Sequence, residues 1–93
     1  MHNNAFFKWL QSNFDKDELI DMVNYGCRNG FSGLIYYDET NQIFNQFEKE
    51  ILEIIKHSGF ECPIKIENYT LLNQFMNDIV WLACELAAYE LIN

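Results

Sequence analysis

Residues 79–89 read Ile-Val-Trp-Leu-Ala-Cys-Glu-Leu-Ala-Ala-Tyr, and Glu85 is the one charged residue among them. A helix that is apolar on nearly every side is typical of the buried centre of a protein. Apolar residues at helical spacing continue this pattern toward the N-terminal side of the stretch. The sequence therefore predicts a helix that starts near Asn68 or Thr70, runs to the C-terminus and forms the core.

Two shorter amphipathic segments open the chain. The first covers residues 3–12, and Asn3 or Asn4 can cap its N-terminus with a side-chain oxygen. The second opens near Asp15, where acids in the first turn suit the helix dipole. Gly26 can end it, because glycine tolerates the left-handed backbone of a helix C-cap. Each segment is expected to form a helix.

A longer amphipathic segment follows a glycine-containing turn. We expect Thr40 to be the N-cap of a helix that runs to about His57. Its apolar residues recur at helical spacing, and its opposite face carries most of its charges. That apolar stripe consists of Ile43, Phe47, Ile51 and Ile54.

Length and composition favour one helical domain. A chain of 93 residues is the size of a single domain, here residues 1–93, and 49% hydrophobic content is enough for a modest core. One proline and four glycines leave few turns, which favours long helices over many short strands. The predicted fold is mainly α, a compact bundle of about four helices. At most a minor β element is expected, at residues 34–37 or 64–66.

Charge restricts the class of partner. The net charge of −8 repels nucleic-acid phosphates and anionic membrane surfaces, so neither is expected to bind directly. A basic protein surface would be attracted, and the attraction would speed encounter. The alternative is that the charge only keeps the protein soluble. No stretch is long and apolar enough to span a membrane, and residues 1–4 lack the features of a signal peptide, so the expected location is the cytoplasm.

Motifs for catalysis or metal binding are weak. Cys27, His57, Cys62 and Cys84 are scattered singly, whereas zinc sites usually use closely spaced pairs of ligands. Three cysteines without paired spacing indicate reduced, packing thiols. Ser32 does not lie in a nucleophile-elbow motif, and few histidines are present to act as a base. We therefore expect no metal, no cofactor and no enzymatic activity.

Glu85 has three interpretations. It lies on a narrow exposed strip of the last helix, or it is buried with a polar partner such as Tyr36, Tyr37 or Arg28, or it takes part in catalysis. A buried carboxylate needs such a partner because its desolvation is costly. The chain also has more aromatic residues than a small core needs, so some are expected at the surface, where they favour protein binding. These are Trp9, Phe14, Tyr25, Tyr36, Tyr37, Phe60, Tyr69 and Tyr89.

Two stretches carry a family resemblance. Residues 30–40 read Gly-Phe-Ser-Gly-Leu-Ile-Tyr-Tyr-Asp-Glu-Thr and are followed by Phe44 and Glu50-Ile51. The second stretch is residues 77–81, continued by Ala83, Glu85 and Ala88. Together they resemble an uncharacterised family of small acidic proteins encoded by phages and prophages. The resemblance implies structural roles in the turn and in the C-terminal helix. The residues concerned are Gly30, Gly33, Tyr36, Thr40, Trp81 and Glu85.

The resemblance also implies a biological setting. Small acidic phage proteins often inhibit host defence, and anti-CRISPR proteins are among them. We therefore expect a phage-encoded protein in the bacterial cytoplasm that inhibits a nucleic-acid-directed defence complex by occupying its basic surface. The alternative is a non-inhibitory phage module, such as a regulatory subunit that forms a homodimer through aromatic residues. The acids expected to contact the partner are Asp15, Asp17, Asp21, Glu39, Glu48, Glu50 and Glu53.

Overall fold

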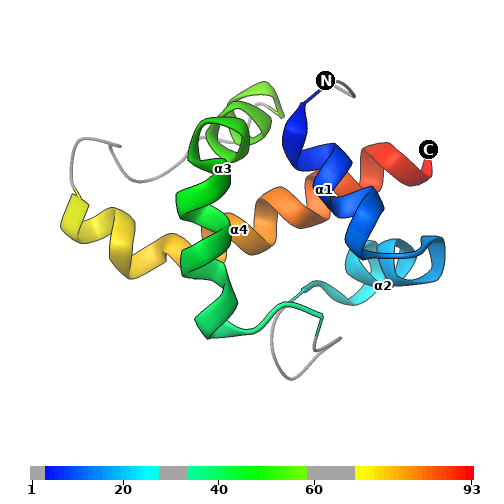
Figure 1. Cartoon of the computed structure of the whole chain (residues 1–93), viewed down its shortest axis with the longest axis horizontal. Coiled ribbons are helices and arrows are strands. Elements are labelled where there is room, and N and C mark those ends of the chain that lie inside the picture. The colour runs from blue at the N-terminus through cyan, green and yellow to red at the C-terminus, as the bar shows by residue number, and fades with distance from the viewer. Residues whose placement is uncertain (1–3, 28–33, 59–68) are drawn as a thin grey trace.

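The computed structural model describes residues 4–27, 34–58 and 69–93, with the backbone alone at residues 37 and 69–75. These residues form four helices, α1 (Ala5–Asn13), α2 (Lys16–Tyr25), α3 (Tyr37–His57) and α4 (Tyr69–Ile92) (Figure 1). The prediction of a mainly α, compact four-helix bundle is confirmed. The described residues contain no strand, and Tyr37 begins α3 instead of ending an extended run. The other proposed β element, at residues 64–66, lies outside the described residues.

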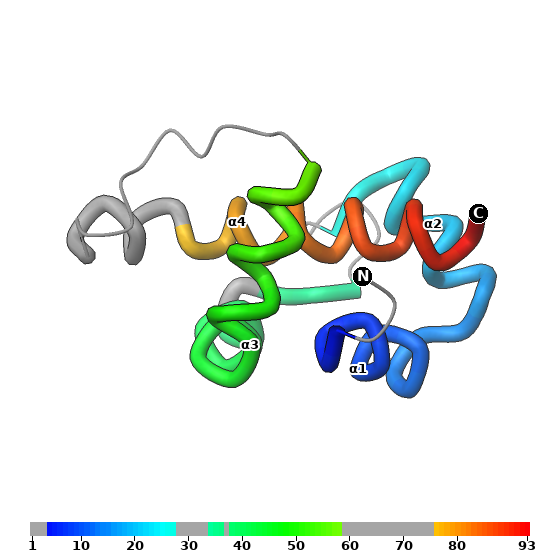
Figure 2. The backbone as a smooth tube through the Cα atoms, turned by 90° about the horizontal axis from the view of Figure 1, so that it is seen from above, coloured from blue at the N-terminus to red at the C-terminus, as the bar shows by residue number. Residues whose placement is uncertain are grey.

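The fourth helix organises the bundle, as its composition predicted. It contacts α1, α2 and α3, and α3 crosses it (Figures 1 and 2). The first two helices lie near its C-terminal end (Figure 1). Eight of its described side chains, within residues 76–92, are buried, and removal of this apolar surface from water is the main force that holds the four helices together. These side chains are Met76, Ile79, Val80, Trp81, Ala83, Cys84, Ala87 and Ala88.

Helix α1 begins, and α2 begins and ends, at the capping residues that the sequence predicted. The Asn4 side chain accepts a hydrogen bond of 2.8 Å from the backbone amide of Phe6. Asp15 and Glu18 form a reciprocal capping box, which satisfies two backbone donors at the start of α2. Gly26 caps the other end with φ 82°, a backbone conformation that favours glycine.

The predicted start of α3 is wrong by one turn. The helix begins at Tyr37, and Tyr36 is the N-cap, so Thr40 lies within the helix. The Thr40 side chain is fully buried, and its hydroxyl donates a hydrogen bond to the side-chain oxygen of Asn77 on α4. A polar group removed from water needs such a partner. Thr40 therefore joins α3 to α4 instead of capping α3.

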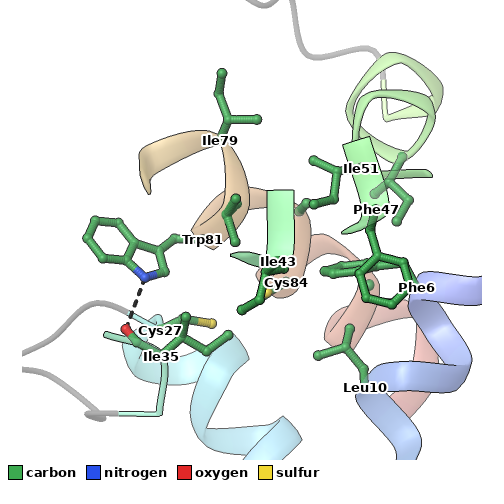
Figure 3. Packing of buried hydrophobic residues seen from close by; sticks show 14 of the residues in the cluster. Phe6, Leu10, Cys27, Ile35, Ile43, Phe47, Ile51, Ile79, Trp81 and Cys84 are labelled. Carbon is green, nitrogen blue, oxygen red and sulfur yellow. Dashed lines mark hydrogen bonds between the residues drawn. The ribbon is translucent and has the colours of Figure 1, made fainter. Parts of the chain in front are cut away.

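A kink at Phe47 divides α3 into two parts that run in different directions (Figure 1). Phe47 has φ −124° and ψ 26°, which are not helical values. Its ring packs against Phe6 at 5.5 Å and against Trp9 at 5.7 Å between ring centroids (Figure 3 shows Phe6 and Phe47). Phe14 extends this aromatic cluster, with its ring 5.8 Å from that of Trp9 in a T-shaped arrangement. The cluster joins α1 to the middle of α3.

Trp81 anchors the segment that leads into α3. Its indole nitrogen donates a 3.1 Å hydrogen bond to the backbone oxygen of Ile35 (Figure 3). Both side chains are buried, and the bond satisfies a carbonyl that no helix pairs. The ring thus fills the core and also fixes the backbone at Ile35, just before α3.

None of the described helices combines the length and the apolar character that crossing a membrane would require.

Candidate functional site: acidic surfaces of α2 and α3

The first acidic surface lies on α2. Asp15, Asp17 and Asp21 are all exposed within seven residues, and Lys16 is the only base among these residues. Asp17 and Asp21 are one helical turn apart, so both point from the same side of α2. Tyr25 continues that side by another turn and is 63% exposed. We refer to Asp17, Asp21 and Tyr25 as the α2 surface.

Asp15 differs from the two aspartates of the α2 surface. Its carboxylate accepts a 2.8 Å hydrogen bond from the Glu18 amide, as part of the capping box. The Glu18 side chain is similarly engaged with the Asp15 amide. A cationic partner that binds Asp15 has to share this carboxylate with the helix end. Asp15 is therefore less available to bind a cationic partner than its exposure alone indicates.

The second acidic surface lies on α3, where the kink divides the predicted set. Glu39 lies before Phe47, and the other three acids lie after it. Glu48 and Glu53 are exposed, and we refer to this pair as the α3 surface. It alternates with lysines at positions 49 and 56, so its charge is partly balanced.

Glu50 is less available than the other acids of α3. Its side chain is half-buried, and its backbone oxygen accepts a 3.5 Å hydrogen bond from the Asn4 side chain. The sequence pattern placed Glu50 with its neighbours on one outer face. Packing of the α1 N-terminus against the second part of α3 separates it from them.

The two surfaces are separate. Among the described residues α2 contacts α4 and makes no contact with α3, while α1 lies against both α3 and α4. The seven predicted acids therefore do not gather at one place. A single partner contacts both surfaces only if it extends around the bundle.

An open groove lies between the ends of α3 and α4. It has a volume of about 530 Å³, and its lining includes Ile54 and His57 from α3 together with Leu86 and Glu90 from α4. Tyr89 contributes a side chain that is 61% exposed. Sequence reasoning flagged Tyr89 as a surface aromatic but did not place it beside His57.

The predicted surface aromatics divide into two groups. Tyr25, Tyr36 and Tyr89 are exposed, as expected for interaction residues. Trp9 and Phe14 are partly buried and belong to the aromatic cluster of α1 and α3. The remaining members of the predicted set are not described at the level of side chains.

Glu85 is half-buried and lies against the end of α2. A Cβ atom placed on Gly26 would be 2.9 Å from the Glu85 Oε1 atom, so the absence of a side chain at Gly26 makes room for this carboxylate. The interpretation as a packed residue agrees with this position better than that of an exposed strip. Gly30 and Gly33, the other glycines with predicted structural roles, lie outside the described residues.

Sequence reasoning missed one pair of chemically capable residues. Cys27 and Cys84 are both fully buried, and the Cys27 thiol is close enough to Cys84 to affect its ionisation. Burial raises the pKa of the Cys84 thiol well above its ordinary value, and the neighbouring Cys27 thiol adds to this effect. The spacing of the two cysteines in the sequence does not predict the pair, because it is the packing of α2 on α4 that brings the two residues together. Within the described part of the chain, no three His, Cys, Asp or Glu side chains gather as a metal-binding group.

Comparison with known proteins gives a family but no function. The family described as "Domain of unknown function (DUF7222)" matches residues 1–93. No curated protein and no solved structure matches the chain.

Proposed function

The chain belongs to the DUF7222 family, and we propose that it acts by binding the basic surface of a host protein or ribonucleoprotein complex. The class of target that we propose is a nucleic-acid-directed defence complex, such as a CRISPR–Cas effector. Binding there would inhibit the complex by covering lysines and arginines that otherwise hold nucleic acid. In this proposal the protein is a phage-encoded inhibitor and has no catalytic role.

The α2 surface is the observation that carries this proposal. Its two aspartates are exposed one turn apart, and the net charge of the whole chain is −8. Charge complementarity of this kind raises the rate of encounter and selects against acidic partners. Tyr25 adds a ring beside the carboxylates, and arginine side chains stack favourably on such rings. An arginine-bearing surface therefore fits α2 better than a neutral one.

The α3 surface is expected to contribute less than the α2 surface to binding the same partner. Glu48 and Glu53 are exposed but alternate with lysines, so the field that an approaching cationic surface meets is smaller. Charges of mixed sign on an exposed helix are also typical of a face that only contacts solvent. We accordingly assign the main contact to α2 and a supporting role to α3.

The test is a binding assay against purified CRISPR–Cas effector complexes of several types. The proposal predicts that at least one complex binds the protein, that its target DNA competes, and that added salt weakens the interaction. Binding that salt and DNA leave unchanged would refute the electrostatic mechanism. Absence of binding to every complex in the panel would contradict the proposed class of target.

A second candidate function is a non-inhibitory module that self-associates. The exposed ring of Tyr89 beside the apolar side chains of Ile54 and Leu86 favours it, because exposed aromatics at a groove are common in interfaces. Trp9 and Phe14, the residues first expected to form a dimer contact, already pack within the chain. Light scattering separates the candidates, since a dimer disrupted by Tyr89→Ser supports self-association and a monomer excludes it.

A further inference from the structure

Two thiols from distant parts of the sequence meet in the core. Cys27 follows the end of α2, and Cys84 lies within α4 (Figure 3). Both side chains are 0% exposed and belong to the same buried hydrophobic cluster. Figure 3 shows the two residues in the same part of the core, where the Cys27 thiol is close enough to Cys84 to raise the pKa of that thiol, and both cysteines are free in this structure. Two such sulfurs can form a covalent bond if they lose two electrons and two protons.

The surroundings favour a neutral product over a charged one. Burial disfavours the Cys84 thiolate, and the carboxylate of Glu85 adds to this effect. A metal site usually needs more than two protein ligands, and no three His, Cys, Asp or Glu side chains gather in the described part of the chain. A disulfide carries no charge and needs no hydrogen-bond partner, so it is compatible with the same site.

We propose that Cys27 and Cys84 form an intramolecular disulfide under oxidising conditions, as a redox-sensitive crosslink that ties the end of α2 to α4. The crosslink is independent of the proposed function, although it acts on the helix that carries the α2 surface. In the reduced state, only packing and hydrogen bonds hold this end of α2 against the core.

The reaction is a thiol–disulfide exchange with a small-molecule disulfide such as oxidised glutathione. Cys27 gives up its proton and attacks one sulfur of glutathione disulfide, the S–S bond of which breaks, and one glutathione leaves and is protonated. Cys84 then loses its proton and attacks the Cys27 sulfur of the mixed disulfide, which releases the second glutathione. The two protein thiols are oxidised, and one glutathione disulfide is reduced to two glutathione molecules.

The positions of the two residues determine the order of attack. Cys27 lies beyond the last helical residue of α2, so its exposure to a reagent does not require a helix to unwind. Cys84 is held within the central helix and reacts only after the mixed disulfide has been brought to it. Cys27 is therefore the attacking thiol and Cys84 the resolving thiol.

The experiment uses the full chain with Cys62→Ser, which leaves only the two cysteines of the pair. Incubation with excess glutathione disulfide should remove both alkylatable thiols, and mass spectrometry should find Cys27 linked to Cys84 within one chain. Because the link closes a long segment, the melting temperature should rise by about 10 °C or more. Adding a reductant should return it to the starting value.

Two controls keep this test decisive. The same protein in urea shows whether the oxidant suffices once both thiols are accessible. Cys27→Ser in the Cys62→Ser background should show no thermal shift on oxidation. If the folded protein keeps both thiols, or forms only mixed disulfides, while the urea control forms the crosslink, the proposal is overturned. A crosslink without a rise in melting temperature would also overturn the stabilising role assigned to it.

Discussion

Helices α4 and α2 bury very different shares of their surfaces. Residues 76–92 of α4 place eight side chains in the core, whereas α2 buries only Leu19 and Met22. The exposed side of α2 carries aspartates, while the core-forming half of α4 has few charges. The comparison separates α4, the helix that contributes most to the core, from α2, the helix that carries the proposed partner surface. Changes on α4 should therefore alter folding, and changes on the outer side of α2 should alter binding.

Trp81→Ala on α4 should have the largest effect on stability. Removal of a buried indole leaves a cavity and an unpaired Ile35 carbonyl, and we expect a loss of about 3–5 kcal/mol in the free energy of unfolding. Urea denaturation measures it. Trp81→Phe keeps most of the ring volume and should lose about 1–3 kcal/mol, mainly from the missing hydrogen bond. Equal losses for the two variants would show that the ring volume contributes nothing, whereas no loss for Trp81→Phe would show that the bond contributes nothing.

Gly26→Ala should have the next largest effect, since it strains the junction between α2 and α4. The positive φ at Gly26 disfavours any side chain, and the new Cβ would lie 2.9 Å from the Glu85 carboxylate. We expect a loss of about 1–3 kcal/mol in thermal or urea unfolding. Glu85→Ala in the same chain should recover only the part due to contact. Full recovery would mean that the backbone conformation is not the main cost.

Asp15→Ala should remove the N-cap of α2 and cost about 1 kcal/mol of stability. Asp15→Asn keeps a capping oxygen and should leave the unfolding free energy nearly unchanged. The pair separates capping from charge, because both variants remove the same carboxylate. If both lose stability equally, the negative charge near the helix dipole matters more than the cap.

The fold was largely predictable because each helix end depends on nearby residues. Asn4, Asp15 and Gly26 act through their own backbone and the next turn, so the sequence pattern located them. The start of α3 was predicted wrongly because the Thr40 hydroxyl bonds to Asn77 instead of capping the helix, and a local sequence pattern does not reveal such a tertiary contact. The kink at Phe47 was missed for a related reason. No proline or glycine marks it, and the ring packs against residues of α1.

The candidate site was predictable in its residue types but not in its layout. Six of the seven acids are exposed, as amphipathic spacing indicated. Their division into two surfaces depends on the kink and on the position of α1, which are properties of the assembled bundle. The meeting of Cys27 with Cys84 likewise depends on how α2 packs against α4. Local patterns contain no information about such contacts.

The most direct measurement compares charge reversal on the two surfaces. Asp17→Lys with Asp21→Lys and Glu48→Lys with Glu53→Lys change the net charge by the same amount, and neither pair includes a capping or buried residue. Both variants should remain folded, and the α2 pair should unfold at a slightly lower temperature because Asp17 lies in the first turn of α2, where the helix dipole favours an acid. The measured quantity is the dissociation constant for the effector complex that binds the wild-type protein. The α2 pair should weaken binding by about tenfold to a hundredfold, and the α3 pair by only about threefold. Equal weakening by both pairs, or none from the α2 pair, would contradict the assignment of the binding surface to α2.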